Sequence, residues 1–168
     1  RLGVELVLDA ESESVNAHAL NYMSMLGGHE DMLILRDELT DDTYDVRPKL
    51  VINAAGPWID ATNHKFGMST KYIGGTKGSH IVVKHDELRK ALGENEFFFE
   101  NKDGRIVLIF PLFDRVIIGT SDIPVDNPDD IRCTNDEIDY LLDLVRRIFP
   151  TIKLSRSDVV FQFSGGRP

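Results

Sequence analysis

The sequence predicts an α+β protein in which a mainly antiparallel sheet is covered by a helix. Short segments of alternating apolar and polar residues recur along the chain, which is typical of strands with one buried face. Two of them are joined by Asn101-Lys102-Asp103-Gly104, and strands joined by so tight a turn must be antiparallel. Residues 135–149 instead repeat apolar side chains at helical spacing.

The segment 135–149 gives the clearest single prediction of a helix. Thr134 and Glu137 form a T-x-x-E capping box at its start, and Pro150 ends it. Six apolar residues make a continuous stripe along one side: Ile138, Leu141, Leu142, Val145, Ile148 and Phe149. We interpret this helix as a cover for the sheet, without a part in chemistry.

The sequence before residue 32 is harder to assign. Residues 14–26 place Val15, Ala19 and Met23 on one helical face before Gly27-Gly28, which predicts a helix over 14–26. Residues 4–8 fit a strand and a helix equally well, so both alternatives stay open. The strands predicted farther along cover residues 32–35, 44–46, 50–53, 80–84, 96–100, 105–110, 115–119 and 159–163.

Composition excludes several classes of protein. The 168 residues suffice for one ordinary domain or for parts of two. Hydrophobic residues make up 42% without a run long enough to span a membrane, and the formal net charge of -9 argues against nonspecific nucleic-acid binding. The single Cys133 excludes an internal disulfide framework and fits a reducing compartment.

The two ends of the sequence suggest a piece of a longer protein. The first residue is Arg1, with no signal segment after it, and Gly165-Gly166-Arg167-Pro168 resembles a turn into further structure. We therefore expect an internal fragment, with the glycine-rich stretch 67–78 as a seam between two structural regions.

Common catalytic motifs are missing from the sequence. It has no G-x-x-x-x-G-K-[ST] or G-x-G-x-x-G phosphate loop, no G-x-S-x-G elbow and no H-E-x-x-H, and its five histidines lack metal-ligand spacing. We therefore predict no metal site. Four segments remain unexplained by simple alternation: 53–58, 74–80, 119–122 and 164–168.

The first of these segments, Asn53-Ala54-Ala55-Gly56-Pro57-Trp58, is unusual for its small side chains. Such a string lets another group approach the backbone closely. The alternative is a tight turn from a strand into a helix, with Pro57 at the first helical position. The residues alone do not decide between the two.

Six motifs in register identify a family. The segments VINAAGPWID, KGSHIVV, DGRIVLIFP, IIGTSD, NDEIDYLLDLV and FSGGRP resemble the middle of FAD-dependent glycerol-3-phosphate dehydrogenases, in the D-amino-acid-oxidase-like flavoprotein superfamily. The resemblance covers residue 30 to the end and, more loosely, the start. It implies part of an FAD-binding domain over 1–66 (helix, β-meander and NAAGPW turn) and a substrate-binding domain over 67–168, truncated where the chain returns to the FAD domain.

The resemblance also implies roles for particular residues. The turn would pass beside FAD, which makes Ala54, Ala55, Gly56, Pro57 and Trp58 the expected cofactor contacts. Segments that face the substrate cavity match Lys77, Thr120 and Asp122. His80 would take the hydroxyl proton as general base, and Arg167 would hold the substrate's anionic group. The competing interpretations are structural: a strand-initiating His80, a turn-capping Asp122 and a solvated Arg167.

The implied reaction is oxidation of sn-glycerol 3-phosphate to dihydroxyacetone phosphate, with hydride transfer from C2 to FAD and electrons passed to a quinone. The family suggests a cytoplasmic protein with peripheral membrane attachment, and a homo-oligomer. By itself the chain should be inactive, because the glycine fingerprint that holds FAD falls outside it. The alternatives are a related FAD oxidase acting on glycerol 3-phosphate or an amino acid, and a noncatalytic binding module.

Overall fold

The computed structural model describes residues 2–167, which form two compact units. We call the first the meander unit, residues 2–53 with Ala61–Thr70, and the second the sheet unit, Ala54–Asp60 with residues 71–167. The division after Thr70 lies inside the glycine-rich stretch 67–78, and the turn at 54–60 groups with the sheet unit. The assignment of 1–66 and 67–168 to FAD-binding and substrate-binding domains stays a prediction.

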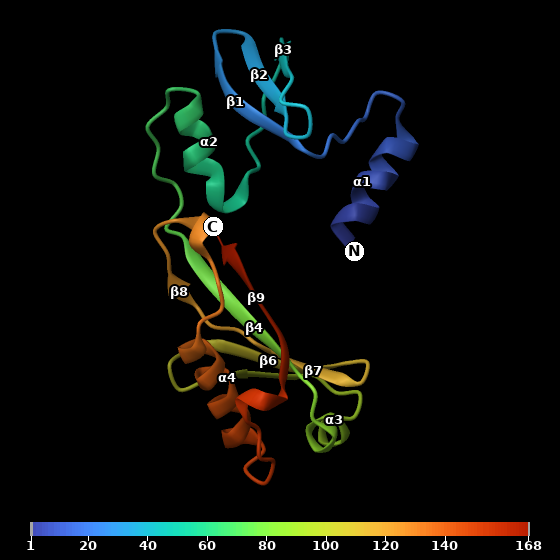
Figure 1. Cartoon of the computed structure of the whole chain (residues 1–168), viewed down its shortest axis with the longest axis vertical. Coiled ribbons are helices and arrows are strands. Elements are labelled where there is room, and N and C mark those ends of the chain that lie inside the picture. The colour runs from blue at the N-terminus through green and yellow to red at the C-terminus, as the bar shows by residue number, and fades with distance from the viewer. Residues whose placement is uncertain (1, 168) are drawn as a thin grey trace. The chain divides into compact units, whose positions relative to one another are not determined.

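The meander unit contains a three-stranded antiparallel sheet in the order β1-β2-β3 (Figure 1). Its elements are α1 (Leu2–Glu13), β1 (Met23–His29), β2 (Met32–Asp37), β3 (Thr43–Val46) and most of α2 (Ile59–Lys65). Strand β1 pairs with β2 in a register that shifts between Met25 and Gly27. The predicted strands at 32–35 and 44–46 therefore correspond to β2 and β3.

Two predictions for this unit are wrong. The helix expected over 14–26 is absent, because residues 23–29 pair with β2 as strand β1, and the helix lies earlier, at Leu2–Glu13. The open alternative at residues 4–8 is thereby decided in favour of a helix. The strand expected over 50–53 has no strand partner among the described residues and is irregular. Neither α1 nor any other described helix is long and apolar enough to cross a membrane.

The sheet unit is built on a six-stranded sheet with neighbouring strands antiparallel. The path β5-β6-β7-β4-β8 is extended by β9, which also pairs with β4. The strands are β4 (Thr76–Val83), β5 (Phe97–Glu100), β6 (Ile106–Leu112), β7 (Arg115–Gly119), β8 (Ile123–Pro124) and β9 (Val159–Arg167). The hairpin at Asn101–Gly104 forms as predicted, with the Asn101 N–H donating to the Arg105 carbonyl at 2.7 Å.

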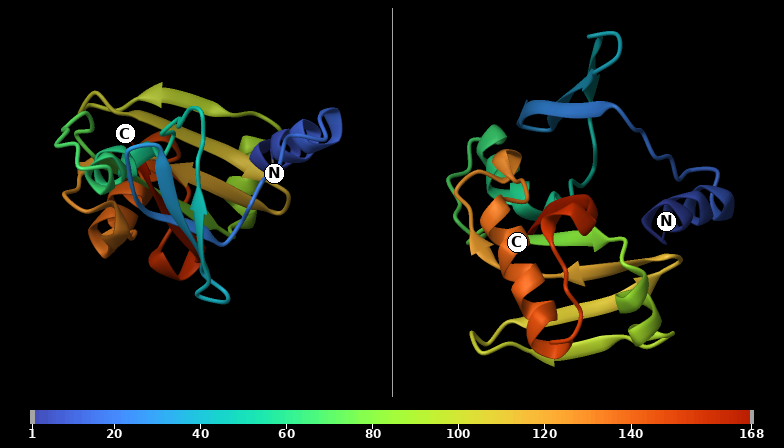
Figure 2. Two further views of the ribbon diagram at one scale, coloured as in Figure 1. Left: turned by 90° about the horizontal axis from the view of Figure 1, so that it is seen from above. Right: turned by 60° about the horizontal axis from the view of Figure 1, so that its bottom comes forward.

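Helix α4 (Asn135–Ile148) covers one face of this sheet (Figure 2). The predicted capping box is present, since Thr134 and Glu137 each accept from the other's backbone N–H. Leu141, Leu142 and Val145 of its apolar side are almost completely buried, and burial of each such side chain stabilises the fold by about 1.5–3 kcal/mol. The short α3 (Asp86–Leu92) adds Leu88 and Leu92 to the same core. The predicted α+β class is confirmed.

Three 3₁₀ turns complete the sheet unit: η1 (Gly56–Trp58), η2 (Pro128–Asp130) and η3 (Arg156–Asp158). The first, which leads directly into α2, carries Pro57 at its start, so the small-residue segment does turn into a helix. The Trp58 indole N–H donates to Asp129 at 2.8 Å, which joins η1 to η2.

Candidate functional site

Alternation along β4 assigns its side chains to opposite faces of the sheet. Ile81 and Val83 point into the core beneath α4, so Gly78 and His80 belong to the other face. On β9, Phe163 pairs with His80 and Arg167 pairs with Thr76. The open face of these two strands thus gathers an imidazole, an aromatic ring and a guanidinium.

The Arg167 guanidinium is held by the loop that follows β7. Its Nη2 donates to Thr120 Oγ1 at 2.8 Å and to the Ser121 carbonyl at 3.5 Å, and its Nη1 lies 3.5 Å from Asp122 Oδ1. The Arg167 side chain remains 42% exposed. Of the residues predicted to bind substrate, Arg167, Thr120 and Asp122 therefore lie together.

Two glycines make room for this arrangement. A Cβ on Gly78 would lie 2.8 Å from Arg167 Cζ and 2.6 Å from Thr120 Oγ1, so the bare backbone lets the guanidinium lie across β4. A Cβ on Gly119 would lie 2.6 Å from His80 Nε2. A larger residue at Gly78 would displace the Arg167 side chain, and a larger residue at Gly119 would displace the His80 side chain.

His80 stacks on Phe163, with ring centroids 5.0 Å apart and ring planes only 4° from parallel. Partial burial, and then the positive charge of Arg167, lower the pKa of His80 below its ordinary 6.5. The imidazole is therefore mainly neutral at neutral pH, which is the form that accepts a proton.

The turn at Ala54–Trp58 contacts the strand that carries Arg167. A Cβ on Gly166 would lie 3.1 Å from Pro57 Cγ and 2.9 Å from Ile131 Cδ1, so the proline ring packs on bare β9 backbone. Gly56 has φ +55°, and a Cβ there would meet no described atom within 4 Å. The predicted cofactor-contacting turn and the predicted anion-binding arginine are thus neighbours within the sheet unit.

Small side chains and an open Gly56 fit the approach of a flat cofactor such as FAD to this backbone. Ala54 is exposed, and Ala55, Gly56 and Pro57 are half-buried, so the segment presents backbone and little side-chain bulk. Trp58 contributes less directly, because its indole N–H is bonded to Asp129.

Lys77 does not agree with its predicted contact with substrate. Its side chain lies on the face of the sheet that α4 covers, and its Nζ is 2.7 Å from Glu137 Oε2. Lys77 as a whole residue is only 7% exposed. Lys77 Nζ also donates to the Arg132 carbonyl at 2.7 Å. The predicted strand at 80–84 started too late to show that Lys77 and His80 would face opposite ways.

Sequence reasoning also missed Glu137 and the glycines that shape the site. Glu137 was assigned only to a capping box, and that signal could not show that its carboxylate also accepts from Ser79 and Ser121. The small residue at Gly78 could have been flagged by its position inside a strand, which often marks a close approach to backbone.

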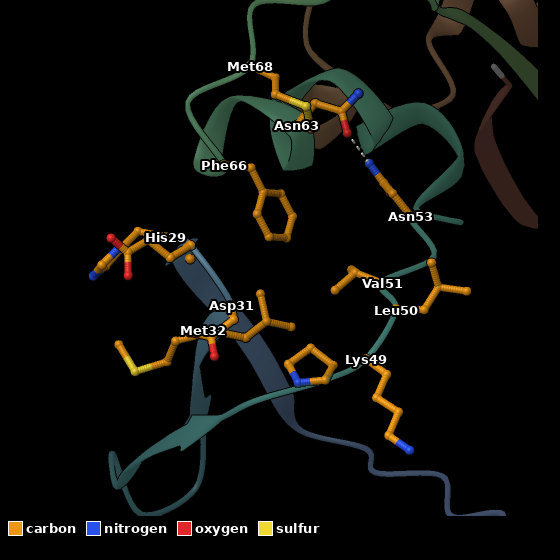
Figure 3. Close-up of a pocket in the computed structure, with 14 residues that line it drawn as sticks. His29, Asp31, Met32, Lys49, Leu50, Val51, Asn53, Asn63, Phe66 and Met68 are labelled. Atoms are coloured by element: carbon orange, nitrogen blue, oxygen red, sulfur yellow. Dashed lines mark hydrogen bonds between the residues drawn. The ribbon is translucent and has the colours of Figure 1, made fainter.

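A separate cavity of about 580 Å³ lies within the meander unit (Figure 3). Two of the residues that line it are hydrogen-bonded to each other, since the Asn53 side-chain amide donates to Asn63 at 2.7 Å. The Asn63 amide in turn donates to Thr70 at 3.1 Å. The irregular segment 49–53, where a strand was predicted, forms part of the lining. The complete lining is Gly28, His29, Glu30, Asp31, Met32, Leu33, Pro48, Lys49, Leu50, Val51, Asn53, Asn63, Phe66 and Met68.

Within residues 2–167 no cluster of three His, Cys, Asp or Glu side chains is placed so that it could hold a metal ion. The candidate site consists of Arg167, Thr120, Asp122 and His80 on the sheet, with the turn at 54–58 beside β9.

Comparison with known proteins decides the family. A family model described as FAD dependent oxidoreductase, DAO, matches residues 1–168. The chain belongs to this family. DAO relatives include the aerobic glycerol-3-phosphate dehydrogenase of Staphylococcus saprophyticus, 30% identical over all of this chain and 31% of the relative. The enzyme of the same name from Staphylococcus aureus strain USA300 is 33% identical over 79% of this chain and 24% of the relative.

Two solved structures agree with the fold. The glycerol-3-phosphate dehydrogenase from Bacillus halodurans, complexed with FAD, superimposes with a TM-score of 0.80 at 31% identity, over 96% of this chain and 34% of that one. L-proline dehydrogenase from P. horikoshii gives a TM-score of 0.58 at 15% identity, over 93% and 40%, which shows the fold alone. This DAO chain spans about a third or less of the curated relatives described above. The predicted family is confirmed, and its description names FAD as the cofactor on which its oxidoreductases depend.

Proposed function

We propose that this chain supplies the substrate-facing part of an FAD-dependent glycerol-3-phosphate dehydrogenase, which oxidises sn-glycerol 3-phosphate to dihydroxyacetone phosphate and passes electrons to a quinone. The single observation that carries the proposal is that the Arg167 guanidinium and the His80 imidazole, whose pKa is lowered, lie on the same open face of the sheet. The names of the relatives and of the Bacillus halodurans structure support the substrate.

Arg167 would bind the phosphate. A guanidinium presents N–H donors in a planar fork that matches a phosphate, and its charge strengthens each hydrogen bond. Thr120 and Asp122 hold Nη2 and Nη1 from one side, which fixes the fork before substrate arrives. The half-exposed guanidinium remains within reach of an anion from solution.

His80 would accept the proton of the C2 hydroxyl. Arg167 lies across Gly78, and Gly78 and His80 are two residues apart, which corresponds to about 7 Å along a strand. A short phosphate ester anchored at Arg167 would thus extend toward the imidazole. The lowered pKa keeps His80 neutral, and Phe163 fixes the plane of its ring.

The residues that would hold FAD in this chain are Ala54, Ala55, Gly56, Pro57 and Trp58, through the open backbone of their turn. The chemistry that FAD supplies when bound is acceptance of the hydride from C2. This chain's own residues orient the substrate and remove the proton. We further propose a cytoplasmic protein that attaches peripherally to a membrane, where a quinone acceptor is found, and that forms homo-oligomers.

The test uses the full-length protein, purified with FAD, and follows reduction of a dye by glycerol 3-phosphate and by glycerol. Arg167→Ala should lower kcat/KM for the phosphate ester by about 10- to 150-fold, the range expected when a hydrogen-bonded charge worth 1.5–3 kcal/mol is lost. Turnover of glycerol should change little. Arg115→Ala, which removes an exposed arginine of β7, is the matched control.

Equal effects on both substrates would contradict the role of Arg167. Hydrogen peroxide formed in step with substrate would indicate the oxidase alternative, and a full-length protein that binds no FAD would indicate the noncatalytic module. The 168-residue chain by itself should be colourless and inactive. A yellow preparation of it that reduces dye would refute that expectation.

A further inference from the structure

Beneath the candidate site, on the α4 face of the sheet, lies a cluster of buried polar side chains. We call Lys77, Ser79, Ser121 and Glu137 the buried network; they are 7%, 0%, 1% and 3% exposed. Three of these residues come from β4 and the loop after β7, and Glu137 comes from the first turn of α4. The network therefore joins three elements that are distant in the sequence.

Glu137 is the centre of the network. Its Oε1 accepts from Ser79 Oγ and from Ser121 Oγ, each at 2.6 Å, and its Oε2 accepts from Lys77 Nζ at 2.7 Å. Burial by itself would raise the pKa of Glu137, but the hydrogen bonds from Lys77, Ser121 and Ser79 outweigh burial and lower it to about 2. The carboxylate is thus charged, and each oxygen has a specific partner.

Two members of the buried network are adjacent in the sequence to residues of the candidate site. Ser121 lies between Thr120 and Asp122, the two side chains that contact Arg167. Ser79 lies between Gly78, over which Arg167 passes, and His80. The Ser79 N–H donates to Ser121 Oγ at 2.9 Å, which ties the loop to β4. A hydrogen bond made below the sheet therefore fixes groups above it.

We propose that Glu137 is a positioning residue, which holds Ser79 and Ser121 and thereby sets the spacing between the anion-binding Arg167 and the proton-accepting His80. The inference rests on the proposed function. It assigns Lys77 the part of counter-ion to Glu137. The carboxylate that caps α4 also aligns the two halves of the site.

The geometry separates this role from stability alone. A merely structural Glu137 would lower the activity of the enzyme toward every substrate in proportion, because a smaller fraction of molecules would be folded. A positioning Glu137 affects the substrate that must reach both Arg167 and His80 more than a substrate without phosphate. The ratio of kcat/KM for glycerol 3-phosphate to that for glycerol therefore distinguishes the two.

The experiment compares three variants of the full-length FAD-loaded protein. Glu137→Gln removes the charge and should lower the ratio by up to about 100-fold, the loss that a displacement of about 1 Å can cause. Ser121→Ala removes one hydrogen bond to Glu137 but keeps the Lys77–Glu137 ion pair, so the variant should still fold. It should lower the ratio by about 10-fold. Asp139→Asn removes an exposed carboxylate of the same helix and should leave the ratio unchanged.

Calorimetric titration with dihydroxyacetone phosphate gives a readout that is independent of turnover. Its dissociation constant should rise in Glu137→Gln and Ser121→Ala and stay constant in Asp139→Asn. An unchanged ratio and an unchanged dissociation constant in Ser121→Ala would overturn the inference while leaving the proposed function intact. A wild-type protein without preference for the phosphate ester would overturn both.

Discussion

The meander unit and the sheet unit differ in whether they bury a core of their own. The hydrophobic core runs from Ile81 to Leu154, entirely within the sheet unit. Among the described residues of the meander unit only Asn63 is buried, and Leu6 and Leu8 of α1 are 60% and 57% exposed. Since apolar burial is the main favourable contribution to folding, the sheet unit should be stable by itself and the meander unit should depend on surfaces outside it.

Hydrogen exchange in the 168-residue chain should show the largest contrast. Amides of β4, β7 and α4 should exchange only when the hydrophobic core unfolds. Amides of α1 and β1 belong to elements that bury few side chains, so local unfolding should expose them. Exchange in the first group should be slower by roughly a thousandfold or more, measured by mass spectrometry. Comparable rates in the two units would break the comparison.

A matched pair of leucine substitutions tests the same difference in burial between the two units. Leu141 is completely buried, so Leu141→Ala should lower the free energy of unfolding by about 2–5 kcal/mol. Leu6→Ala, on exposed α1, should change it by less than about 0.5 kcal/mol. Guanidinium denaturation followed by circular dichroism measures both. A large loss from Leu6→Ala would mean that α1 is packed in solution.

Acid should weaken the sheet unit through Glu137. Its pKa of about 2 in the folded protein lies below the ordinary 4.5, so its stabilising effect is complete above pH 4.5 and is lost as pH falls toward 2. The loss should be of the order of 1–3 kcal/mol. It should be missing in Glu137→Gln when unfolding free energies are measured across this pH range. Asp143→Asn, which removes an exposed carboxylate of the same helix, is the control and should retain the loss.

The smallest predicted effect concerns His80. Because Phe163 covers its ring, Phe163→Ala should let water in and raise the pKa of His80 toward 6.5. An NMR titration of the imidazole would show this directly. Phe161→Ala, which removes a ring that lies tilted beside Phe163, is the control and should leave the pKa of His80 nearly unchanged. A pKa that does not move in Phe163→Ala would assign the shift to other causes.

Local signals predicted the sheet unit well. The capping box at Thr134 and Glu137, the helix that follows it and the hairpin at Asn101–Gly104 each depend on a few adjacent residues, and all three formed. The short α3 was missed, because seven residues show too little periodicity to distinguish a helix from a loop.

Local sequence signals failed where pairing between strands decided the secondary structure. Gly27-Gly28 was interpreted as the end of a helix, but the two glycines belong to β1, whose register with β2 shifts beside Gly27. The family resemblance singled out His80, Arg167, Thr120 and Asp122, and these residues are close in the structure, while their roles stay predictions. The predicted contact of Lys77 with substrate does not agree with the structure, because the direction of its side chain follows only from the start of β4 at Thr76.

The pairing of β4 with β9 has a consequence for how the molecule is made. His80 lies opposite Phe163, so the two halves of the site come from segments that are about half the chain apart. Closing so long a loop is entropically costly until the intervening strands are in place. During synthesis on a ribosome the sheet face that carries His80 and Phe163 should therefore be assembled last, after the hairpins and helix that lie between these two strands have already formed.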